Sequence, residues 1–500
     1  MAFLSLTGRV ACAAALFAAS VAASAAGAAD PVEGRWWGTI GPERDRIEAG
    51  VEFVRDDGGG LVVKLTQPVL NLYGADIGPA ERTGDRVTVA ALALELTLRD
   101  GELVGHFPGP RSPARLARVE AMPAEPPLPA VPTGPGPRWQ VRLGGQAFAT
   151  PAVAGGRAFV GSTGGVVTAV EVATGEIAWA RAVGHPVYGE AAVDDDAVYV
   201  VSDGGFLHRL ARADGVEAWR ADLGGGAAPR VLPHPAVFDW DWQAPRPLLV
   251  DGVAIVGSAD GSLHAIDVAT GEHRWRAQGD SPVRNGAARA GDVVVVGDHA
   301  GHLHALALAD GAPRWTVETG APIDAIPAVH DGAVLVGNRG YGLYALDAAT
   351  GAERWKTYFW GSWVESGAVV VDGTIYVGAS DLRRVSAIDP ADGRPLWRTD
   401  VRGWTWGTPL VDGGVIYAGA AGGTPYFIAH HAGLAVLARD DGRLLARWPL
   451  PDGGGHQWGI AGSPVDGGDV VLVTTIDGAL LAFPKWPWSG GTTPAAPAAK

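Results

Sequence analysis

Short apolar runs separated by Gly and Asp turns dominate the chain from residue 138 to residue 484. Residues 251–275 show the pattern in the stretch DGVAIVGSADGSLHAIDVATGEHRW, where two apolar runs bounded by Gly turns precede a closing run that ends in Trp. Short runs of this kind between turn residues are typical of β-strands. Because the sequence shows no long helical pattern, we expect an all-β fold.

The last turn of each unit and its Trp recur in register. The motif A-x-D-x-x-T-G-x-x-x-W, or a close variant, repeats with spacings of 40, 40, 56, 40, 40, 42 and 51 residues between tryptophans. The tryptophans of this series are Trp139, Trp179, Trp219, Trp275, Trp315, Trp355, Trp397 and Trp448. A period of about 40 residues with four short strands per unit predicts a β-propeller.

The unit count predicts eight blades. Seven units carry the complete hairpin followed by Trp, whereas the last, residues 469–484, lacks the closing Gly turn and Trp. The segment RWQVRL at 138–143 has Trp139 but no strands of its own before it. If this segment supplies the outer strand of the last blade, the ring closes without an open sheet edge.

Three segments lie outside the repeat. Residues 31–120 contain short apolar runs rich in Val, Leu and Thr, which predict a small β-barrel or sandwich domain. The early position of Trp36 and Trp37, just before a Gly, resembles that in lipocalin-like barrels. Residues 121–137 contain seven prolines and predict an extended linker that does not pair into a sheet. Residues 485–500 are expected to form a flexible tail.

Residues 1–29 are predicted to be an export signal. Arg9 precedes an apolar run from Val10 to Val21, and small residues with Ala-x-Ala cleavage options follow before Asp30. The only cysteine, Cys12, lies inside this run rather than at a cleavage point. We therefore expect a periplasmic or secreted protein without a lipid anchor, and a mature chain without disulfides, thiolates or Cys-ligated zinc.

The net charge of −15, with no cluster of basic residues, argues against nucleic acid and against an anionic membrane surface as partners. No segment is long and apolar enough for a transmembrane helix. We expect a monomer.

The repeat motif resembles that of the quinoprotein-type propellers, usually called the PQQ-like repeat, over residues 138–484. The resemblance implies a ring like that of quinoprotein alcohol dehydrogenases or of the outer-membrane assembly factor BamB. In this family the Gly makes the turn and the Trp docks against the neighbouring blade. The dehydrogenases carry adjacent cysteines and a calcium site, neither of which we find here. BamB-like proteins are lipoproteins without an extra N-terminal domain, which also differs from this chain.

Candidate site residues concentrate in the connections between blades. In a four-stranded blade, the connections from the outer strand to the next inner strand emerge on the same face as the turns between the second and third strands. Both long insertions, after Trp219 and before Trp448, fall on this face. The residues expected to ring the channel mouth are Tyr188, Trp240, Trp242, Arg284, Asp324, Trp360, Trp363, Glu365, Trp404, Trp406 and Trp458. A concave aromatic surface with a few charges is a common form of ligand site.

Structural roles compete with these assignments. Any one of these tryptophans could instead fill a wide channel, because Trp is mostly buried in proteins. His208, His264 and His304 occupy the same place in three units, so they spread around the ring and no metal site is expected from them. His430 and His431 lie in the second insertion and could take part in binding.

Three functions fit the sequence. We favour a binding or scaffold protein that holds a protein partner or a small ligand on the Trp-rich face. The first alternative is a PQQ-dependent dehydrogenase of alcohols or sugars, in which Arg284 would clamp a quinone carboxylate and Asp324 or Glu365 would act as the base. The second is a glycan-binding module, since aromatic faces stack on sugar rings. No cofactor is certain, although PQQ is possible.

Overall fold

The computed structural model describes residues 30–41, 46–92, 94–106, 113–226, 230, 242–424, 426, 428–452 and 457–488. The chain divides into two compact units. Of the described residues, the N-terminal unit comprises those between 30 and 128 together with Tyr426 and Ile428, and the propeller unit comprises the rest. The predicted signal segment 1–29 lies outside the described residues. None of the described helices is long and apolar enough to cross a membrane.

The N-terminal unit contains one antiparallel sheet in the order β4-β3-β2-β1-β9-β8-β7-β6-β5. Two single 3-10 turns, η2 (Pro68–Leu70) and η3 (Ala90–Leu92), interrupt it. Its strands are β1 (Gly34–Ile40), β2 (Ile47–Arg55), β3 (Leu61–Gln67), β4 (Leu72–Pro79), β5 (Glu81–Thr83), β6 (Arg86–Val89), β7 (Leu94–Arg99), β8 (Glu102–His106) and β9 (Pro113–Val119).

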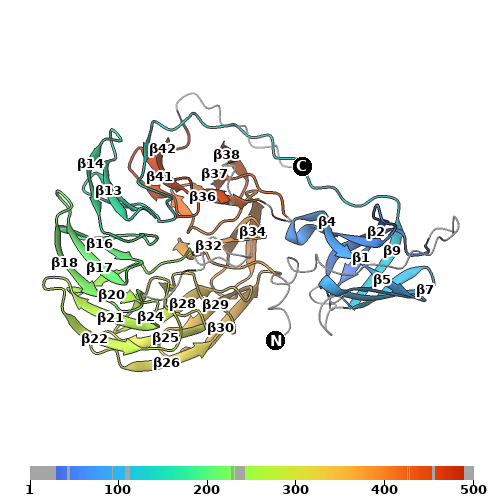
Figure 1. The fold of residues 1–500 in the computed structure, drawn as a ribbon, viewed down its shortest axis with the longest axis horizontal. Coiled ribbons are helices and arrows are strands. Elements are labelled where there is room, and N and C mark those ends of the chain that lie inside the picture. Colours follow the sequence, from blue (N-terminus) through green and yellow to red (C-terminus); the bar gives the residue numbers. More distant parts are fainter. Residues whose placement is uncertain are drawn as a thin grey trace. The chain divides into compact units, whose positions relative to one another are not determined.

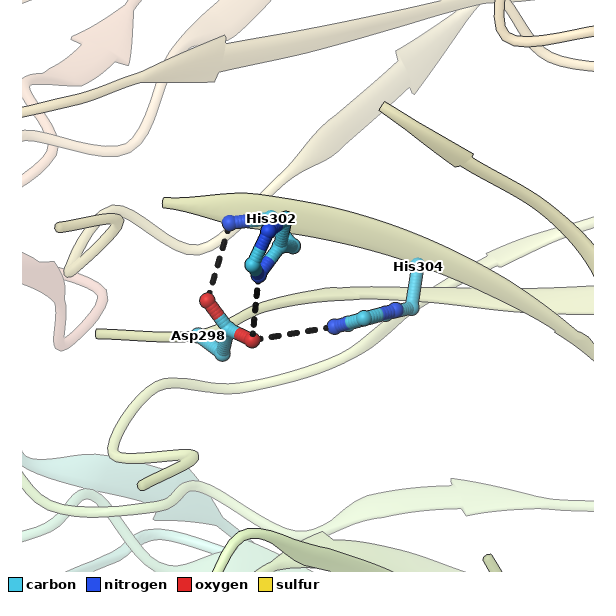
Figure 2. A group of neighbouring side chains, drawn as sticks. All are labelled: Asp298, His302 and His304. Atoms are coloured by element: carbon cyan, nitrogen blue, oxygen red, sulfur yellow. Dashed lines mark hydrogen bonds and ion pairs between the residues drawn. The ribbon is translucent and has the colours of Figure 1, made fainter. Parts of the chain in front are cut away.

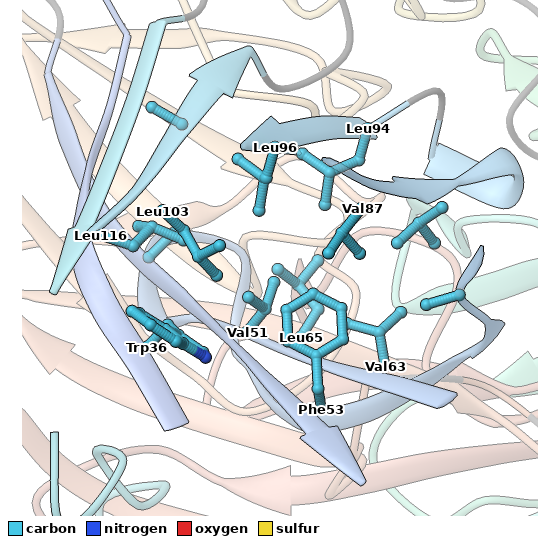
Figure 3. Packing of buried hydrophobic residues seen from close by; sticks show 14 of the residues in the cluster. Trp36, Val51, Phe53, Val63, Leu65, Val87, Leu94, Leu96, Leu103 and Leu116 are labelled. Carbon is cyan, nitrogen blue, oxygen red and sulfur yellow. The ribbon is translucent and has the colours of Figure 1, made fainter. Parts of the chain in front are cut away.

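This sheet is a nearly closed barrel. Its two edge strands, β4 and β5, are separated along the chain by Ala80 alone, so the sheet must curl until its edges meet there. Alternate residues face the interior, as in β1, where Trp36 is buried and Trp37 is half-buried. The interior is filled by apolar side chains such as Phe53 and Leu116 (Figure 3).

The propeller unit contains eight antiparallel sheets, which are the blades (Figure 1). Within a blade the strands run in sequence order from the inner strand A to the outer strand D, and inner strands of neighbouring blades contact each other. Blades one to four are β11 (Ala152–Ala154), β12 (Arg157–Gly161), β13 (Val166–Glu171), β14 (Ile177–Ala182); β15 (Ala192–Val193), β16 (Ala197–Ser202), β17 (Phe206–Ala211), β18 (Glu217–Asp222); β19 (Leu248–Val250), β20 (Val253–Gly257), β21 (Ser262–Asp267), β22 (His273–Gln278); and β23 (Ala288–Ala290), β24 (Val293–Gly297), β25 (His302–Ala307), β26 (Pro313–Glu318). Blades five to eight are β27 (Ala328–His330), β28 (Ala333–Gly337), β29 (Gly342–Asp347), β30 (Glu353–Tyr358); β31 (Val369–Val371), β32 (Thr374–Ala379), β33 (Arg384–Ile388), β34 (Pro395–Asp400); β35 (Leu410–Asp412), β36 (Val415–Gly423), β37 (Gly433–Ala438), β38 (Leu444–Pro449); and β40 (Val465–Asp466), β41 (Val470–Thr475), β42 (Ala479–Pro484) with β10 (Trp139–Arg142).

The two ends of the repeat region close the ring, as the sequence predicted. Strand β10 pairs antiparallel with β42, with Trp139 opposite Ala482 and Arg142 opposite Ala479. Arg142 also forms an ion pair with Asp477 at 2.7 Å. In the seventh blade, a short additional strand, β39 (Gln457–Gly459), pairs with the extended end of β36.

The repeated tryptophans dock each blade onto the next part of the ring. The indole Nε1 of seven of them donates a hydrogen bond of 2.8–3.2 Å to a backbone carbonyl of the next blade, and that of Trp448 donates one of 2.6 Å to the carbonyl of Pro135 in the linker. Each indole also lies against a glycine. At Gly311, for example, φ is +70° and an added Cβ would lie 2.7 Å from the ring of Trp275. The repeat Gly is therefore required both for its backbone conformation and for the close approach of the indole.

Two of the predicted segments differ from expectation. Residues 132–134 of the predicted linker do pair with β38: the N–H of Gly134 bonds to the carbonyl of Arg447 and the N–H of Arg447 bonds to the carbonyl of Pro132, both at 3.0 Å. At the other end, residues 485–488 pack on the propeller, since Trp486 is buried and its N–H bonds to the hydroxyl of Tyr417. Residues 489–500 of the predicted tail lie outside the described part of the chain.

Candidate functional site

The D-to-A connections and the B-to-C turns share one face of the propeller, which we call the D–A face. Direct contacts show this arrangement. The N–H of Ile323, in the connection to β27, bonds to the carbonyl of Asp298, in the turn after β24, at 3.0 Å. The N–H of Val364 bonds in the same way to the carbonyl of Asn338 at 3.1 Å. The face predicted to carry the site therefore exists as a continuous hydrogen-bonded surface.

A row of aromatic rings crosses the D–A face. Consecutive centroids lie 5.6, 5.9, 5.6, 4.9 and 4.2 Å apart. In order, the row consists of Tyr188, Phe148, Trp242, Trp406, Trp404 and His430. All members except His430 are at least nine-tenths buried, so they pack on one another instead of forming an open rim.

Trp242 bridges opposite sides of the ring. It lies in the long connection that leads into β19 of blade three, and it packs against Trp406, which leads into β35 of blade seven. Blades three and seven are four positions apart in a ring of eight, so they face each other across the channel. The connection before β19 thus brings the indole of Trp242 into contact with a side chain from the opposite side of the channel.

Hydrogen bonds fix two of these indoles in place. The Nε1 of Trp404 donates to Oδ1 of Asp381 at 2.9 Å, and the Nε1 of Trp406 donates to Oγ of Ser380 at 3.2 Å. A buried indole with a satisfied N–H is typical of a packed structural position. Trp406 also lines the central cavity described below, as do Tyr188, Phe148 and Trp242 of the same row.

A buried network of charged groups lies beside the channel. Asp324 contacts Nε2 of His299 at 2.8 Å and Nε of Arg339 at 2.6 Å, and Arg339 also contacts Glu365 at 2.9 Å. The guanidinium of Arg339 lies 4.5 Å over the ring of Trp363. One arginine thus joins two carboxylates and an aromatic ring, and each carboxylate belongs to a different D-to-A connection.

The pKa values of the two carboxylates in this network are shifted in opposite directions. Burial raises the pKa of Glu365 to about 7, although the charge of Arg339 opposes the rise. Burial would also raise the pKa of Asp324, but the charge of Arg339 and the contact with His299 outweigh burial and lower the pKa to about 2. At neutral pH, Asp324 is charged while Glu365 exchanges its proton.

A cavity of about 410 Å³ lies in the channel and is lined by residues from all eight D-to-A connections. Its ionisable lining includes the carboxylates Glu190, Asp324 and Glu365, while Arg246 is the one basic side chain among the described lining residues. Arg246 pairs with Glu190 at 3.4 Å. Arg284 was predicted to lie at the mouth of the channel. It lines a separate, smaller cavity between blades, together with Arg230.

An aromatic step formed by Tyr341, Tyr358 and Trp360 stands at the periphery of the D–A face. The centroids of Tyr341 and Tyr358 lie 6.2 Å apart, and those of Tyr358 and Trp360 lie 5.6 Å apart. Tyr358 is 48% exposed, and its two neighbours are half-buried. Of the predicted site residues, Trp360 is therefore accessible, but it lies apart from the aromatic row.

The remaining predicted residues take other places. Trp458 is buried in β39 opposite Gly422, and Trp240 lies outside the described residues. In the second insertion, burial lowers the pKa of His430 to about 3, which keeps its ring neutral at the end of the aromatic row. The carbonyl of His431 accepts a hydrogen bond from Arg447 at 2.7 Å.

Sequence reasoning missed Arg339 and His299, the two partners of Asp324. Both occupy the second position after a strand B, in the turns that follow β28 and β24. Their equivalent positions in the B-to-C turns of neighbouring blades are the sequence signal that relates these two residues.

The similarity to known proteins lies in the repeat region of the chain. A family model described as outer membrane protein assembly factor BamB matches residues 133–186, 163–322 and 358–436, which is more than half of the chain. The chain is similar to the outer membrane protein assembly factor BamB of Burkholderia pseudomallei, with 28% identity over 357 residues that cover 69% of this chain and 86% of the relative.

Solved structures share the fold. BamB from Moraxella catarrhalis has a TM-score of 0.55 and 19% identity, over 71% of this chain and 99% of that chain. A quinohemoprotein alcohol dehydrogenase from Pseudomonas putida HK5 has a TM-score of 0.53 and 15% identity, over 72% of this chain and 78% of that chain. The matched repeat and the eight-bladed ring agree, and the chain belongs to the BamB family of PQQ-like repeat propellers.

Proposed function

We propose that this protein is an exported scaffold that contributes to outer membrane protein assembly by holding a protein partner on the D–A face. Membership of the BamB family supports the scaffold role, since the family model is described as an outer membrane protein assembly factor. The apolar segment after Arg9 supports export to the periplasm or beyond.

The observation that carries the proposal is the aromatic step. Tyr341 and Trp360 both adopt left-handed backbone conformations, with φ of +66° and +36°. Such a conformation costs about 1–3 kcal/mol for a bulky residue, and such strain clusters at functional sites. Here it presents adjoining aromatic side chains to solvent beside Tyr358. Exposed Tyr and Trp on a rigid scaffold are typical anchors of protein interfaces.

The exposed apolar residues of the opposite face are arranged differently. Ile177, Val216 and Leu396 lie at or next to the C-to-D turns of three blades, one residue in each of blades one, two and six. Single exposed apolar residues are normal on protein surfaces. The clustered aromatic residues therefore favour the D–A face as the partner-binding surface.

The central cavity does not fit the quinone of the alternative function. Pyrroloquinoline quinone carries three carboxylates, whereas the cavity contributes Glu190, Asp324 and Glu365 against the single lining arginine, Arg246. The guanidinium of Arg339 is already engaged by two carboxylates. Negative charges of the cavity lining disfavour binding of an anion that carries three carboxylates. We therefore derive no step through this cofactor.

Complementation tests the proposal. In a strain that lacks this gene, the Tyr358→Ala/Trp360→Ala variant is expected to leave the level of outer membrane β-barrel proteins low, while wild type restores it. An Ile177→Ala/Val216→Ala variant on the opposite face serves as the matched control and is expected to complement. Full complementation by both double variants would show that the aromatic step has no role in assembly.

A further inference from the structure

Three potential metal ligands converge in blade four, where the turn after β24 leads into β25 (Figure 2). Oδ2 of Asp298 lies 3.2 Å from Nδ1 of His302 and 3.0 Å from Nε2 of His304. The ligand atoms of all three residues lie within 4.8 Å of one another. No metal site was predicted from the sequence, because His208, His264 and His304 hold equivalent positions in different blades and cannot meet.

Strand geometry brings the two imidazoles together. His302 and His304 are two positions apart in β25, so their side chains emerge on the same face of the strand. The turn holds Asp298 beneath them, since the backbone N–H of His302 donates to its Oδ1 at 2.8 Å. This hydrogen bond leaves Oδ2 directed at both rings, as Figure 2 shows.

A neighbouring hydroxyl orients His304. Its Nδ1 lies 3.1 Å from Oγ1 of Thr316 in β26. When Nδ1 carries the proton and donates to this hydroxyl, the lone pair of Nε2 faces Asp298. An outer partner that fixes the tautomer in this way is a regular feature of histidine metal ligands.

The corresponding positions of neighbouring blades lack this arrangement. In blade three, Nε2 of His264 contacts the hydroxyl of Ser262 at 3.0 Å, and in blade two Nε2 of His208 contacts the hydroxyl of Ser202 at 2.9 Å. A hydroxyl thus satisfies the repeat histidine in those blades. Blade four replaces it with a carboxylate and a second imidazole, which makes a three-ligand set from an ordinary repeat position.

We propose that Asp298, His302 and His304 bind a divalent metal ion of the zinc class. Two imidazoles and one carboxylate are ligands that zinc and its neighbours prefer over magnesium or calcium. Metal–ligand distances of about 2.0–2.1 Å place tetrahedral ligands about 3.3–3.4 Å apart, and the two nitrogen–oxygen distances are close to that value. The side chains of His302 and His304 are 39% and 28% exposed, so a fourth position opens toward solvent or a bound ligand.

Zinc binding by the full-length mature protein tests this site. The protein is prepared without a histidine tag, stripped with EDTA and titrated with Zn²⁺ against a chromophoric chelator, and with Co²⁺ while its visible absorption is followed. The variants are His302→Ala, His304→Ala and Asp298→Asn. His273→Ala is the matched control, since it removes an exposed histidine that contacts another imidazole in blade three.

We expect wild type and His273→Ala to bind one equivalent of zinc that EDTA removes, with a Co²⁺ absorption band in the visible range. Each of the three variants is expected to weaken zinc binding at least about tenfold and to lose the Co²⁺ band. Circular dichroism in EDTA confirms that the variants fold. If wild type binds no zinc, or if His302→Ala and His304→Ala bind zinc as tightly as wild type does, the proposal is overturned.

Discussion

Trp242 and Trp406 pack with ring centroids 5.6 Å apart, although they precede strands of opposite blades in the ring. This contact joins the two sides of the channel through side chains. Trp360, which was predicted with these residues, lies instead in a separate aromatic step with Tyr341 and Tyr358, where Tyr358 is exposed and the other two are half-buried.

Replacing Trp242 with alanine is expected to lower the free energy of unfolding of the propeller by about 3–5 kcal/mol, because it removes a buried indole and leaves a cavity. Urea denaturation followed by circular dichroism measures the change. Trp360→Ala is the control, since Trp360 is half-buried, and it should change stability by about 1 kcal/mol or less. Equal effects of the two substitutions would contradict a packed role for Trp242.

Gly311→Ala is expected to lower the free energy of unfolding by more than the cost of a left-handed backbone conformation at a non-glycine residue. A Cβ there would meet the Trp275 ring at 2.7 Å, and the indole would lose its 3.0 Å bond to the carbonyl of Leu308. Gly291 has a similar φ of +66°, but an added Cβ would contact nothing within 4 Å.

Gly291→Ala should therefore cost only about 1–2 kcal/mol, the usual price of a left-handed non-glycine residue. Gly311→Ala should exceed that cost by about 2 kcal/mol or more, because the docked indole must shift. Thermal unfolding of both variants gives the comparison, and a Gly311→Ala variant no less stable than Gly291→Ala would contradict the docking role of the repeat glycine.

Glu365→Gln is expected to change how stability depends on pH. The pKa of Glu365 is raised from 4.5 to about 7, so its contribution is fully present below about pH 4.5 and is lost as the pH rises through about 7. Asp324, with a pKa of about 2, and Arg339 keep their charges over this range. Glutamine stays neutral, so the variant should gain about 2 kcal/mol relative to wild type between about pH 5 and about pH 8.

Denaturation midpoints at several pH values test this expectation. Glu190→Gln replaces a second, half-buried carboxyl of the same cavity for comparison, and the raised pKa of Glu190 predicts a change of the same sign. Parallel stability curves for wild type and Glu365→Gln would show that Glu365 keeps an ordinary pKa in the folded protein.

The sequence predicted the ring because its blades are built from local signals. The spacing of Trp139 to Trp448 reports one docking contact per blade, and the incomplete unit at each end required β10 and β42 to pair. Asp324 and Glu365, which the sequence analysis expected at the channel mouth, both line the cavity in the channel. Such contacts follow directly from repeat register.

Other contacts depend on paths that register does not encode. Nothing in the local pattern says that the long connection before β19 carries Trp242 to Trp406. The linker was expected to stay unpaired because proline lacks an N–H, yet the carbonyl of Pro132 and the N–H of Gly134 suffice to pair with Arg447. The cluster of Asp298, His302 and His304 was not predicted because its members meet within one blade, and the repeat pattern relates only equivalent positions of different blades.

The central claim is that a protein partner binds the D–A face at the aromatic step. Site-specific photo-crosslinking in cells tests it most directly, with the photoreactive residue placed at Tyr358 or, as the control, at the equally exposed Val216 on the opposite face. We predict that position 358 forms a crosslink to a protein of the outer membrane assembly machinery, identified by mass spectrometry, and that position 216 does not. Crosslinking to that machinery from position 216 alone, or from neither position, would contradict this account.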